Sequence, residues 1–161
     1  MRTERETEQA IEAHGDAVRR ICFIHLKNYA DIEDVFQEVF LKYILYERSF
    51  ESHAHERAWL LRVAINQCKD LLKSFFRSRV TSIEDADLSA FTVEEESREV
   101  LDAVFHLPEK YRNVIYLHYY EGYSAGEIAA MLHKKENTVY TWLTRARAQL
   151  KKSLGGDTFD E

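Results

Sequence analysis

The segment from Ser124 to Lys152 has the pattern of two short helices joined by a tight turn. Ser124 and Glu127 have the spacing of a capping box, in which the serine hydroxyl accepts from the third helical N–H and the glutamate accepts from the serine N–H. Apolar residues then recur at helical spacing on both sides of the turn: Ile128, Ala129, Leu132, Val139, Leu143, Ala146 and Leu150. The two stripes can face each other, so the segment is expected to fold as a helix-turn-helix.

The outward face of the second predicted helix carries hydrogen-bonding and cationic side chains. They are Asn137, Thr141, Thr144, Arg145 and Gln149, followed by Arg147, Lys151 and Lys152. Such groups suit base edges and phosphates, so this helix is a candidate reader of DNA. An amphipathic hairpin that binds no nucleic acid is the alternative. Tyr140 and Trp142 lie where a reading helix is usually polar or basic, and either stacking on DNA or cover by a protein fits them.

Few residues oppose helix formation, and no segment sustains the alternation of a β-strand. The 161 residues include one proline and five glycines. The net charge of −6 is unevenly spread, because residues 81–107 carry eight acids against one basic side chain, whereas Lys134 to Lys152 has a net charge of +5. Local charge decides which partner approaches a surface, so the acidic total is compatible with a DNA-binding second half. The expected fold class is all-α.

Helical periodicity divides the chain into two small helical domains joined by a flexible acidic linker, and the second domain contains the helix-turn-helix. The expected first domain, linker, second domain and C-terminal tail span 1–78, 79–97, 98–154 and 155–161. The first domain is expected to hold three amphipathic helices over 6–27, 31–47 and 56–77. Asp31 is the expected cap of the second of these helices. A polar connector over 48–55 leads to the third.

Three blocks in the chain, in the same order, resemble those of compact bacterial RNA polymerase sigma factors of the extracytoplasmic-function (ECF) type. DIEDVFQEVFLKYI, residues 31–44, is similar to the helix that docks on the polymerase clamp. RAWLLRVAINQCKDLLKS, residues 57–74, is similar to the helix that melts and holds the promoter minus-10 element. LPEKYRNVIYLHYYEGYSAGEIAAMLHKKENTVYTWLTRARAQLKK, residues 107–152, is similar to the helix-turn-helix domain that binds the minus-35 element. The resemblance implies a factor that directs promoter recognition and transcription initiation.

The first block implies contacts with core RNA polymerase. The residues are Asp34, Gln37, Glu38 and Leu41. Their helical spacing brings two acids, an amide and an apolar side chain together, a mixture that suits a protein interface better than DNA. A merely solvated helix face is the alternative, but it leaves the surplus of apolar residues in this segment unexplained.

The second block implies contacts with minus-10 DNA. Arg62, Asn66, Lys69 and Lys73 recur at helical spacing and form a polar, cationic stripe that fits a single DNA strand. An ordinary solvated helix face is the alternative for this stripe. The residues expected near a pocket for a flipped base are His53, His55 and Trp59. The two histidines also suggest a metal, but no third and fourth ligand is evident, so no metal site is predicted.

The third block implies contacts with minus-35 DNA, in which phosphate binding is more secure than base reading. The residues are Lys135, Thr138, Thr141, Thr144, Arg145 and Arg147. The block departs from the family pattern at the turn, where His133 replaces a usual glycine, Lys134 an apolar residue and Lys135 a capping serine. Tyr140 and Trp142 replace a lysine and an arginine. These departures leave the minus-35 sequence open.

The resemblance implies core RNA polymerase and promoter DNA as partners, and an anti-sigma factor that holds the protein inactive. No phosphate loop, nucleophile elbow or paired-carboxylate pocket is evident, so neither enzymatic activity nor a cofactor is predicted. Cys22 and Cys68 fit buried thiols in a reducing compartment. We expect a cytoplasmic protein without membrane insertion. The competing hypothesis is a conventional helix-turn-helix regulator that binds duplex DNA as a dimer.

Overall fold

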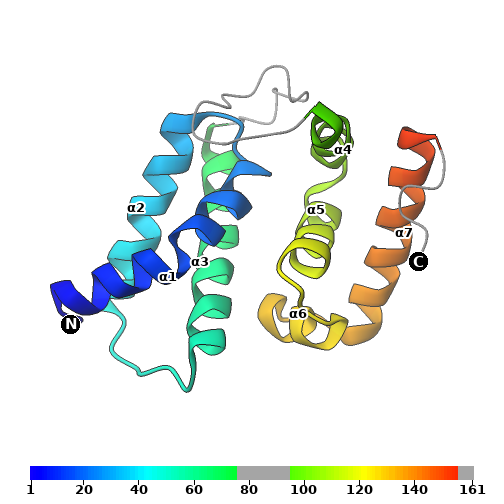
Figure 1. Cartoon of the computed structure of the whole chain (residues 1–161). Helices are drawn as coiled ribbons and strands as arrows, with labels where there is room; N and C mark the ends of the chain where they lie inside the picture. Colours follow the sequence, from blue (N-terminus) through cyan, green and yellow to red (C-terminus); the bar gives the residue numbers. More distant parts are fainter. Residues whose placement is uncertain (76–94, 156–161) are drawn as a thin grey trace. The chain divides into compact units, whose positions relative to one another are not determined.

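The computed structural model describes residues 1–75 and 95–155, and every regular element in these ranges is helical, which confirms the all-α prediction (Figure 1). The chain forms two compact units, Met1–Arg79 and Val80–Glu161. Most of the predicted linker and tail lies outside the described residues. None of the described helices combines the length and apolar character needed to span a bilayer.

Three helices make up the first unit: α1 (Glu4–Phe23), α2 (Tyr29–Leu45) and α3 (His53–Phe75). Each packs against the other two (Figure 1). Their apolar stripes meet in one core, in which the completely buried side chains include Ala17, Val18, Ile21, Ile32, Val39, Leu60, Leu61 and Ala64. Both cysteines are buried in this unit, and neither forms a disulfide within the described residues. Burial of this apolar surface is the main force that holds the three helices together.

The start of α2 differs from the sequence-based prediction. The cap is Asn28 rather than Asp31, because the Asn28 side-chain oxygen accepts a hydrogen bond from the Asp31 N–H at 3.1 Å. Asp31 therefore lies inside the first helical turn, where its negative charge suits the positive end of the helix dipole.

The start of α3 also differs, because the helix begins earlier than predicted. The Ser52 hydroxyl oxygen accepts from the His55 N–H at 3.1 Å, and the helix begins at His53. Both histidines therefore lie in the first turn of α3 rather than in the connector. The connector, which we define as residues 46–52, is correspondingly short.

The second unit contains α4 (Glu95–Phe105), α5 (Glu109–Ile115), α6 (Ala125–Leu132) and α7 (Glu136–Leu154). A π-helical segment, Tyr116–Tyr120, continues directly from α5. α7 contacts the other three α-helices of the unit (Figure 1). The completely buried side chains of this core include Val114, Leu117, Ile128, Val139, Ala146 and Leu150. The apolar stripes predicted on both sides of the turn therefore do face each other.

The predicted helix-turn-helix is formed by α6 and α7. The Ser124 capping box is confirmed, because the serine hydroxyl accepts from the Glu127 N–H at 3.2 Å and the Glu127 carboxylate accepts from the Ser124 N–H at 2.8 Å. In the turn, His133 adopts a left-handed backbone conformation with φ of 56°. Lys135 is the N-cap of α7 and makes no side-chain capping hydrogen bond. The turn thus forms without the glycine and the serine that would favour it.

Candidate protein and nucleic-acid interfaces

One exposed face of α2 carries the four residues predicted to bind polymerase. Asp34, Gln37, Glu38 and Leu41 are all exposed, and their spacing places them along one side of the helix. Leu41 is 49% exposed, and Leu45, one turn further along, is 58% exposed. Large apolar side chains exposed beside a polar cluster are typical of a protein-binding surface. We call these five residues the α2 surface.

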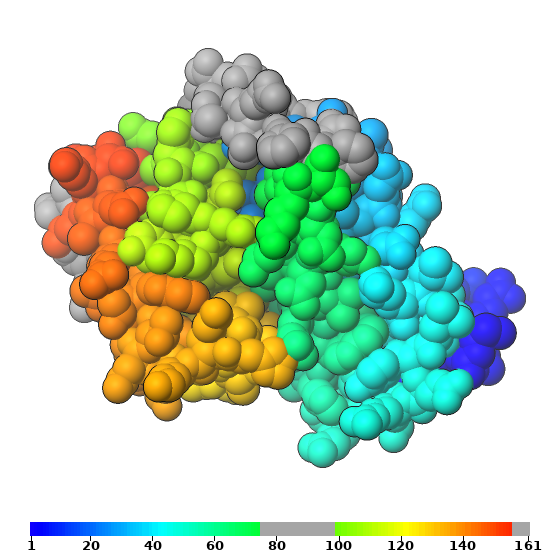
Figure 2. Space-filling view, turned by 180° about the vertical axis from the view of Figure 1, so that it is seen from behind, coloured from blue at the N-terminus to red at the C-terminus, as the bar shows by residue number. Residues whose placement is uncertain are grey.

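A groove of ≈ 220 Å³ lies between α2 and α3 beside the α2 surface. Figure 2 shows these two helices side by side on one face of the first unit. The groove is lined by Asp34, Val35 and Glu38 from α2 and by Gln67, Asp70, Leu71 and Ser74 from α3. The residues from α3 were not predicted, although they recur at three- and four-residue intervals. Two elements therefore contribute to this candidate interface.

An aromatic cluster joins the end of α2, the connector and the start of α3. The Tyr46 and Trp59 rings are 4.6 Å apart between centroids, and Phe50 lies 5.4 Å from Tyr46 and 5.5 Å from Trp59. Tyr43 completes the cluster at 6.1 Å from Phe50. Trp59 is half-buried here, so the predicted pocket residue also fixes the connector against α3.

Arg2 holds the connector from the N-terminal side. Its guanidinium donates to the backbone carbonyls of Tyr43 at 3.3 Å, of Tyr46, and of Arg48 at 2.8 Å. The same group lies 4.5 Å from the centroid of the Tyr43 ring and 4.9 Å from that of Phe50. Both distances are within the range of cation–π attraction. Arg2 therefore bonds to the connector backbone and lies against its aromatic cluster.

A pocket of ≈ 400 Å³ opens beside this cluster, and we call it the connector pocket. It is lined by Arg2, Glu6, Gln9, Ala10, Tyr43, Ser49, Phe50, Ser52, His53 and Glu56. The lining combines ring faces, a cation and hydrogen-bonding groups, which is the chemistry needed to hold an unstacked base. The His53 side chain is 91% exposed at this pocket.

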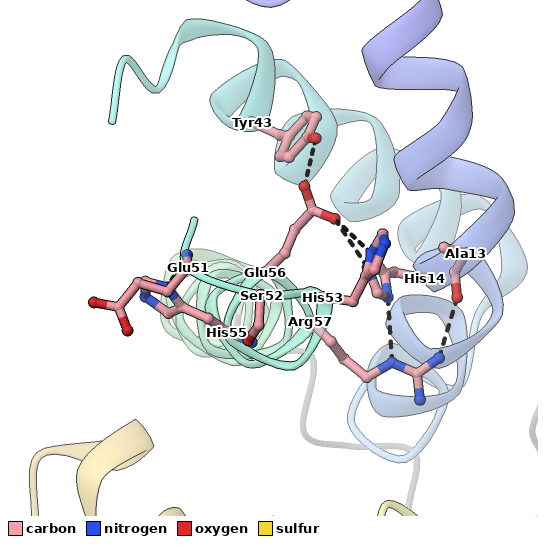
Figure 3. Close-up of polar contacts among 9 residues, drawn as sticks. All are labelled: Ala13, His14, Tyr43, Glu51, Ser52, His53, His55, Glu56 and Arg57. Carbon is pink, nitrogen blue, oxygen red and sulfur yellow. Dashed lines mark hydrogen bonds and ion pairs between the residues drawn. The ribbon is translucent and has the colours of Figure 1, made fainter. Parts of the chain in front are cut away.

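Glu56 connects the three helices of the first unit through hydrogen bonds (Figure 3). One carboxylate oxygen accepts from the Tyr43 hydroxyl at 2.7 Å, and the other lies 3.0 Å from Nε2 of His14. Arg57 donates from Nε to Nδ1 of His14 at 3.3 Å. Because Nδ1 accepts this bond, the ring proton of neutral His14 is on Nε2, which donates to Glu56.

Burial shifts the pKa of two members of this network. Burial lowers the pKa of His14, although the neighbouring Glu56 raises it in part, so His14 is neutral at pH 7. Burial, reinforced by the hydrogen bond to Glu56, raises the pKa of Tyr43 to about 12. Neutral His14 and protonated Tyr43 can both donate to the Glu56 carboxylate.

The histidines near the connector do not converge as a pair. The Nδ1 atom of His55 accepts from the Glu51 N–H at 3.0 Å, while His53 lies toward Glu56 and His14 (Figure 3). His14, His53 and Glu56 each offer one ligand atom, and these atoms lie within 4.8 Å of one another. His14 is hydrogen-bonded to Glu56 and accepts from Arg57, so these residues form a hydrogen-bond network.

The predicted minus-10 stripe lies along one side of α3. Asn66, Lys69 and Lys73 are exposed and Arg62 is half-buried. Trp59 lies on the same side, one turn before Arg62, and His55 precedes it by another turn. We call this set, His55, Trp59, Arg62, Asn66, Lys69 and Lys73, the α3 row. Of the predicted minus-10 residues, only His53 lies off this row.

The predicted minus-35 residues lie on α7 and at its N-cap. Lys135, Thr141, Thr144 and Arg145 are exposed, and Thr138 is half-buried. Arg147 is also half-buried, and its Nη1 atom donates to the Tyr119 hydroxyl at 2.9 Å. One nitrogen of that guanidinium is therefore engaged within the protein.

The two aromatic residues of α7 have different surroundings. Tyr140 is 53% exposed. Trp142 is half-buried, and the centroid of one of its rings lies 5.5 Å from Nζ of Lys110 and 5.9 Å from Nζ of Lys134. Lys110 belongs to α5 and Lys134 to the turn, so residues distant in sequence meet at this ring. The sequence offered no signal for the contact with Lys110.

Two family models match the chain, one in each unit. Sigma-70 region 2 matches residues 10–79, which include α2, the connector and α3. Sigma-70, region 4 matches residues 97–150, which include the helix-turn-helix. Among curated proteins, the ECF sigma factor SigW of Bacillus subtilis is 27% identical, with 89% of this chain and 86% of SigW covered. The ECF sigma factor SigM of Mycobacterium tuberculosis is 29% identical, with 92% and 76% covered.

This chain belongs to the ECF sigma factors. As a sigma factor, it acts with RNA polymerase in promoter recognition and transcription initiation. The matches to both sigma regions give no support to the hypothesis of a conventional dimeric regulator.

The fold of this sigma factor also matches two solved structures. The sigma factor RpoE from Bartonella quintana, solved with the anti-sigma factor NepR, gives a TM-score of 0.76 at 22% identity, with 95% of this chain and 99% of that chain covered. CnrH, solved with the cytosolic domain of CnrY, gives a TM-score of 0.69 at 25% identity, with 97% and 92% covered.

Proposed function

We propose that the α2 surface and the adjoining groove dock on core RNA polymerase. The observation that carries this proposal is the combination of two exposed leucines with two carboxylates and an amide on one helix face. The leucines supply apolar contact area, while Asp34, Gln37 and Glu38 supply directional hydrogen bonds and charge complementarity. Gln67 and Asp70 extend the same surface across the groove onto α3.

We propose that the connector pocket and the α3 row hold the opened minus-10 strand. The pocket offers aromatic faces and hydrogen-bonding groups to a flipped base, with His53 at its edge. Along α3, Arg62, Lys69 and Lys73 can neutralise backbone phosphates while Asn66 hydrogen bonds to the strand. Opening the duplex in this way requires binding energy but no bond cleavage, so the protein itself acts as a non-enzymatic subunit.

We propose that α7 binds the minus-35 duplex. Thr141, Thr144 and Arg145 face outward along one stretch of the helix, and Lys135 stands at its start. These side chains suit phosphates and base edges in a major groove. Arg147 stays a predicted contact through the part of its guanidinium that is not bonded to Tyr119.

We propose that an anti-sigma factor covers the α2 surface when the protein is inactive. RpoE was solved with the anti-sigma factor NepR, and CnrH was solved with the cytosolic domain of CnrY. Leu41→Asp is expected to release a co-purified inhibitor, whereas Glu12→Ala, on the exposed side of α1, is expected to retain it. An inhibitor that binds both variants equally would exclude the α2 surface as its binding site.

Because core polymerase and promoter DNA are cytoplasmic, we propose that the protein acts in the cytoplasm.

The docking proposal is tested by measuring the affinity of the fluorescently labelled full-length chain for core polymerase. The Asp34→Ala, Gln37→Ala double variant is expected to bind at least ~10-fold more weakly, the effect of ~1.4 kcal/mol at an interface. The matched control is Glu8→Ala with Glu12→Ala, two exposed residues of α1. Equal affinity of the double variant and wild type would reject the assignment.

A further inference from the structure

A pair of lysines meets at Trp142 in the helix-turn-helix unit. Lys110 lies in the first turn of α5, and Lys134 lies in the turn between α6 and α7. Both side chains are exposed, and their ammonium groups lie 5.5 and 5.9 Å from the centroid of a Trp142 ring. Lys110 also lies 5.5 Å from the centroid of the Tyr111 ring. Trp142 therefore gathers cations from two separate segments beside the DNA-reading helix.

Neither ammonium group is neutralised within the described part of the chain. Across residues 1–75 and 95–155, neither Lys110 nor Lys134 has a carboxylate partner within salt-bridge distance. An aromatic ring attracts a cation without cancelling its charge. The ring thus restricts where the two side chains lie while both charges stay available to an anion.

We propose that Lys110 and Lys134, positioned by Trp142, form a binding site for backbone phosphates of duplex DNA. The inference rests on the proposed binding of minus-35 DNA by α7, and adds contacts from α5 and the turn that no sequence motif indicates. Lysine ammonium groups bind phosphate as point charges, without reading the base sequence. Ordering two of them before DNA arrives reduces the side-chain entropy lost on binding.

The site also accounts for an unusual residue on α7. Trp142 stands where the family pattern often has a basic residue. A tryptophan at this position by itself removes a cation from the DNA-binding surface. In this chain the tryptophan instead brings two lysines to that position. Trp142 is thus a positioning residue, and the phosphate contacts are made by the lysines.

The test is the salt dependence of binding, because each lost phosphate contact changes the slope of log K against log salt concentration by about 0.9. The full-length chain is titrated with two fluorescein-labelled duplexes over a series of salt concentrations. One is taken from the minus-35 region of a promoter that the protein uses in run-off transcription, and the other has a scrambled sequence. Lys110→Ala and Lys134→Ala are each expected to reduce the slope by about 0.9 on both duplexes. Lys42→Ala, an exposed lysine of α2, is the charge-matched control and is expected to leave the slope unchanged.

Two tryptophan variants test the positioning role. Trp142→Leu is expected to weaken binding at every salt concentration while keeping most of the slope, because both lysines remain but are no longer held in place. Trp142→Phe keeps a ring and is expected to keep most of the wild-type affinity. If Arg145→Ala weakens binding while both lysine variants keep the wild-type slope, the lysine site is overturned and the minus-35 proposal stands. If Arg145→Ala and the lysine variants all bind as wild type, the minus-35 proposal itself fails. Wild-type affinity for Trp142→Leu, with reduced slopes for the lysine variants, overturns the role of Trp142.

Discussion

At the residue scale, Glu56 is where the polar contacts of the first unit converge. Its carboxylate accepts hydrogen bonds from α2 through Tyr43 and from α1 through His14, and its side chain is only 16% exposed. Removing one acceptor therefore leaves two buried donors without a partner. The resulting loss of stability exceeds that expected when an ordinary surface carboxylate is removed.

Glu56→Ala is expected to lower the free energy of unfolding by about 2–3 kcal/mol, because unpaired buried polar groups cost about 1–3 kcal/mol each. Urea denaturation of the full-length chain measures this change. Glu51→Ala, at an exposed position of the connector, is the control and is expected to change stability by less than about 0.5 kcal/mol. A Glu56→Ala protein as stable as the control would show that the network contributes little.

His14 is expected to make the first unit less stable in mild acid. Its pKa is lowered in the folded state, so below its ordinary value of 6.5 the unfolded chain takes up a proton that the folded chain resists. This contribution is complete above pH 6.5 and is lost as pH falls toward the lowered pKa. Urea unfolding at pH 7.5 and 5.5 should show a larger loss in the free energy of unfolding for wild type than for His14→Gln. Equal losses in the two proteins would contradict the lowered pKa of His14.

The placement of the exposed α2 residues on one helix face could be predicted from sequence, but the buried network could not. Asp34, Gln37 and Glu38 follow helical spacing, so a correct helix assignment suffices to place them together. His14 and Glu56 are separated by 42 positions and meet only through the packing of α1 on α3. No periodicity encodes such a contact.

At the element scale, the connector is ordered by groups on both sides of it. Arg2 binds it from the N-terminal segment, and Trp59 packs against it from α3. Arg2 lies before residue 10, where the match to sigma-70 region 2 begins. The N-terminal segment is therefore expected to influence a pocket most of whose other lining residues lie within the sigma-70 region 2 match.

Arg2→Ala is expected to loosen the connector. The variant loses the hydrogen bonds of Arg2 and its cation–π contacts, and the cation–π contacts contribute about 0.5–2 kcal/mol. Hydrogen exchange in residues 46–52 should therefore become several-fold faster. Hydrogen exchange read by mass spectrometry measures this effect. Arg5→Ala, exposed on α1, is the control. Unchanged exchange in Arg2→Ala would show that the aromatic cluster alone orders the connector.

Lys135→Ser is expected to separate stability from DNA binding. Lys135 is an N-cap without a capping side chain, and a serine there should stabilise the second unit by about 1 kcal/mol. The same change removes a cation proposed to bind phosphate, so affinity for duplex DNA should fall. Urea unfolding and duplex titration measure the two effects. A variant that gains stability and keeps full affinity would remove Lys135 from the DNA contacts.

The helices could be predicted from their apolar stripes, whereas some ends could not. Ser124 and Glu127 identify one start by their spacing, and that prediction is confirmed. Asn28 and Asp31 are both capping residue types three positions apart, so sequence alone does not decide between them. Ser52 starts α3 in a polar stretch that offers no apolar period.

At the scale of the whole molecule, two small units divide the proposed tasks. The first presents the α2 surface, the connector pocket and the α3 row, and the second presents α7 with the lysines gathered on Trp142. The segment from Lys134 to Lys152 has a net charge of +5 within a chain of net charge −6. Its positive field suits DNA, whereas the acidic side chains of α2 suit a protein partner.

The central claim is that this chain confers promoter-specific initiation on core polymerase through the α2 surface. Run-off transcription from a genomic fragment library tests it most directly, with wild type compared against the Asp34→Ala, Gln37→Ala variant. We predict new start sites that depend on the wild-type protein and weaken in the variant. The absence of new initiation with core polymerase, together with a shift of duplex DNA by the protein alone, would contradict the account.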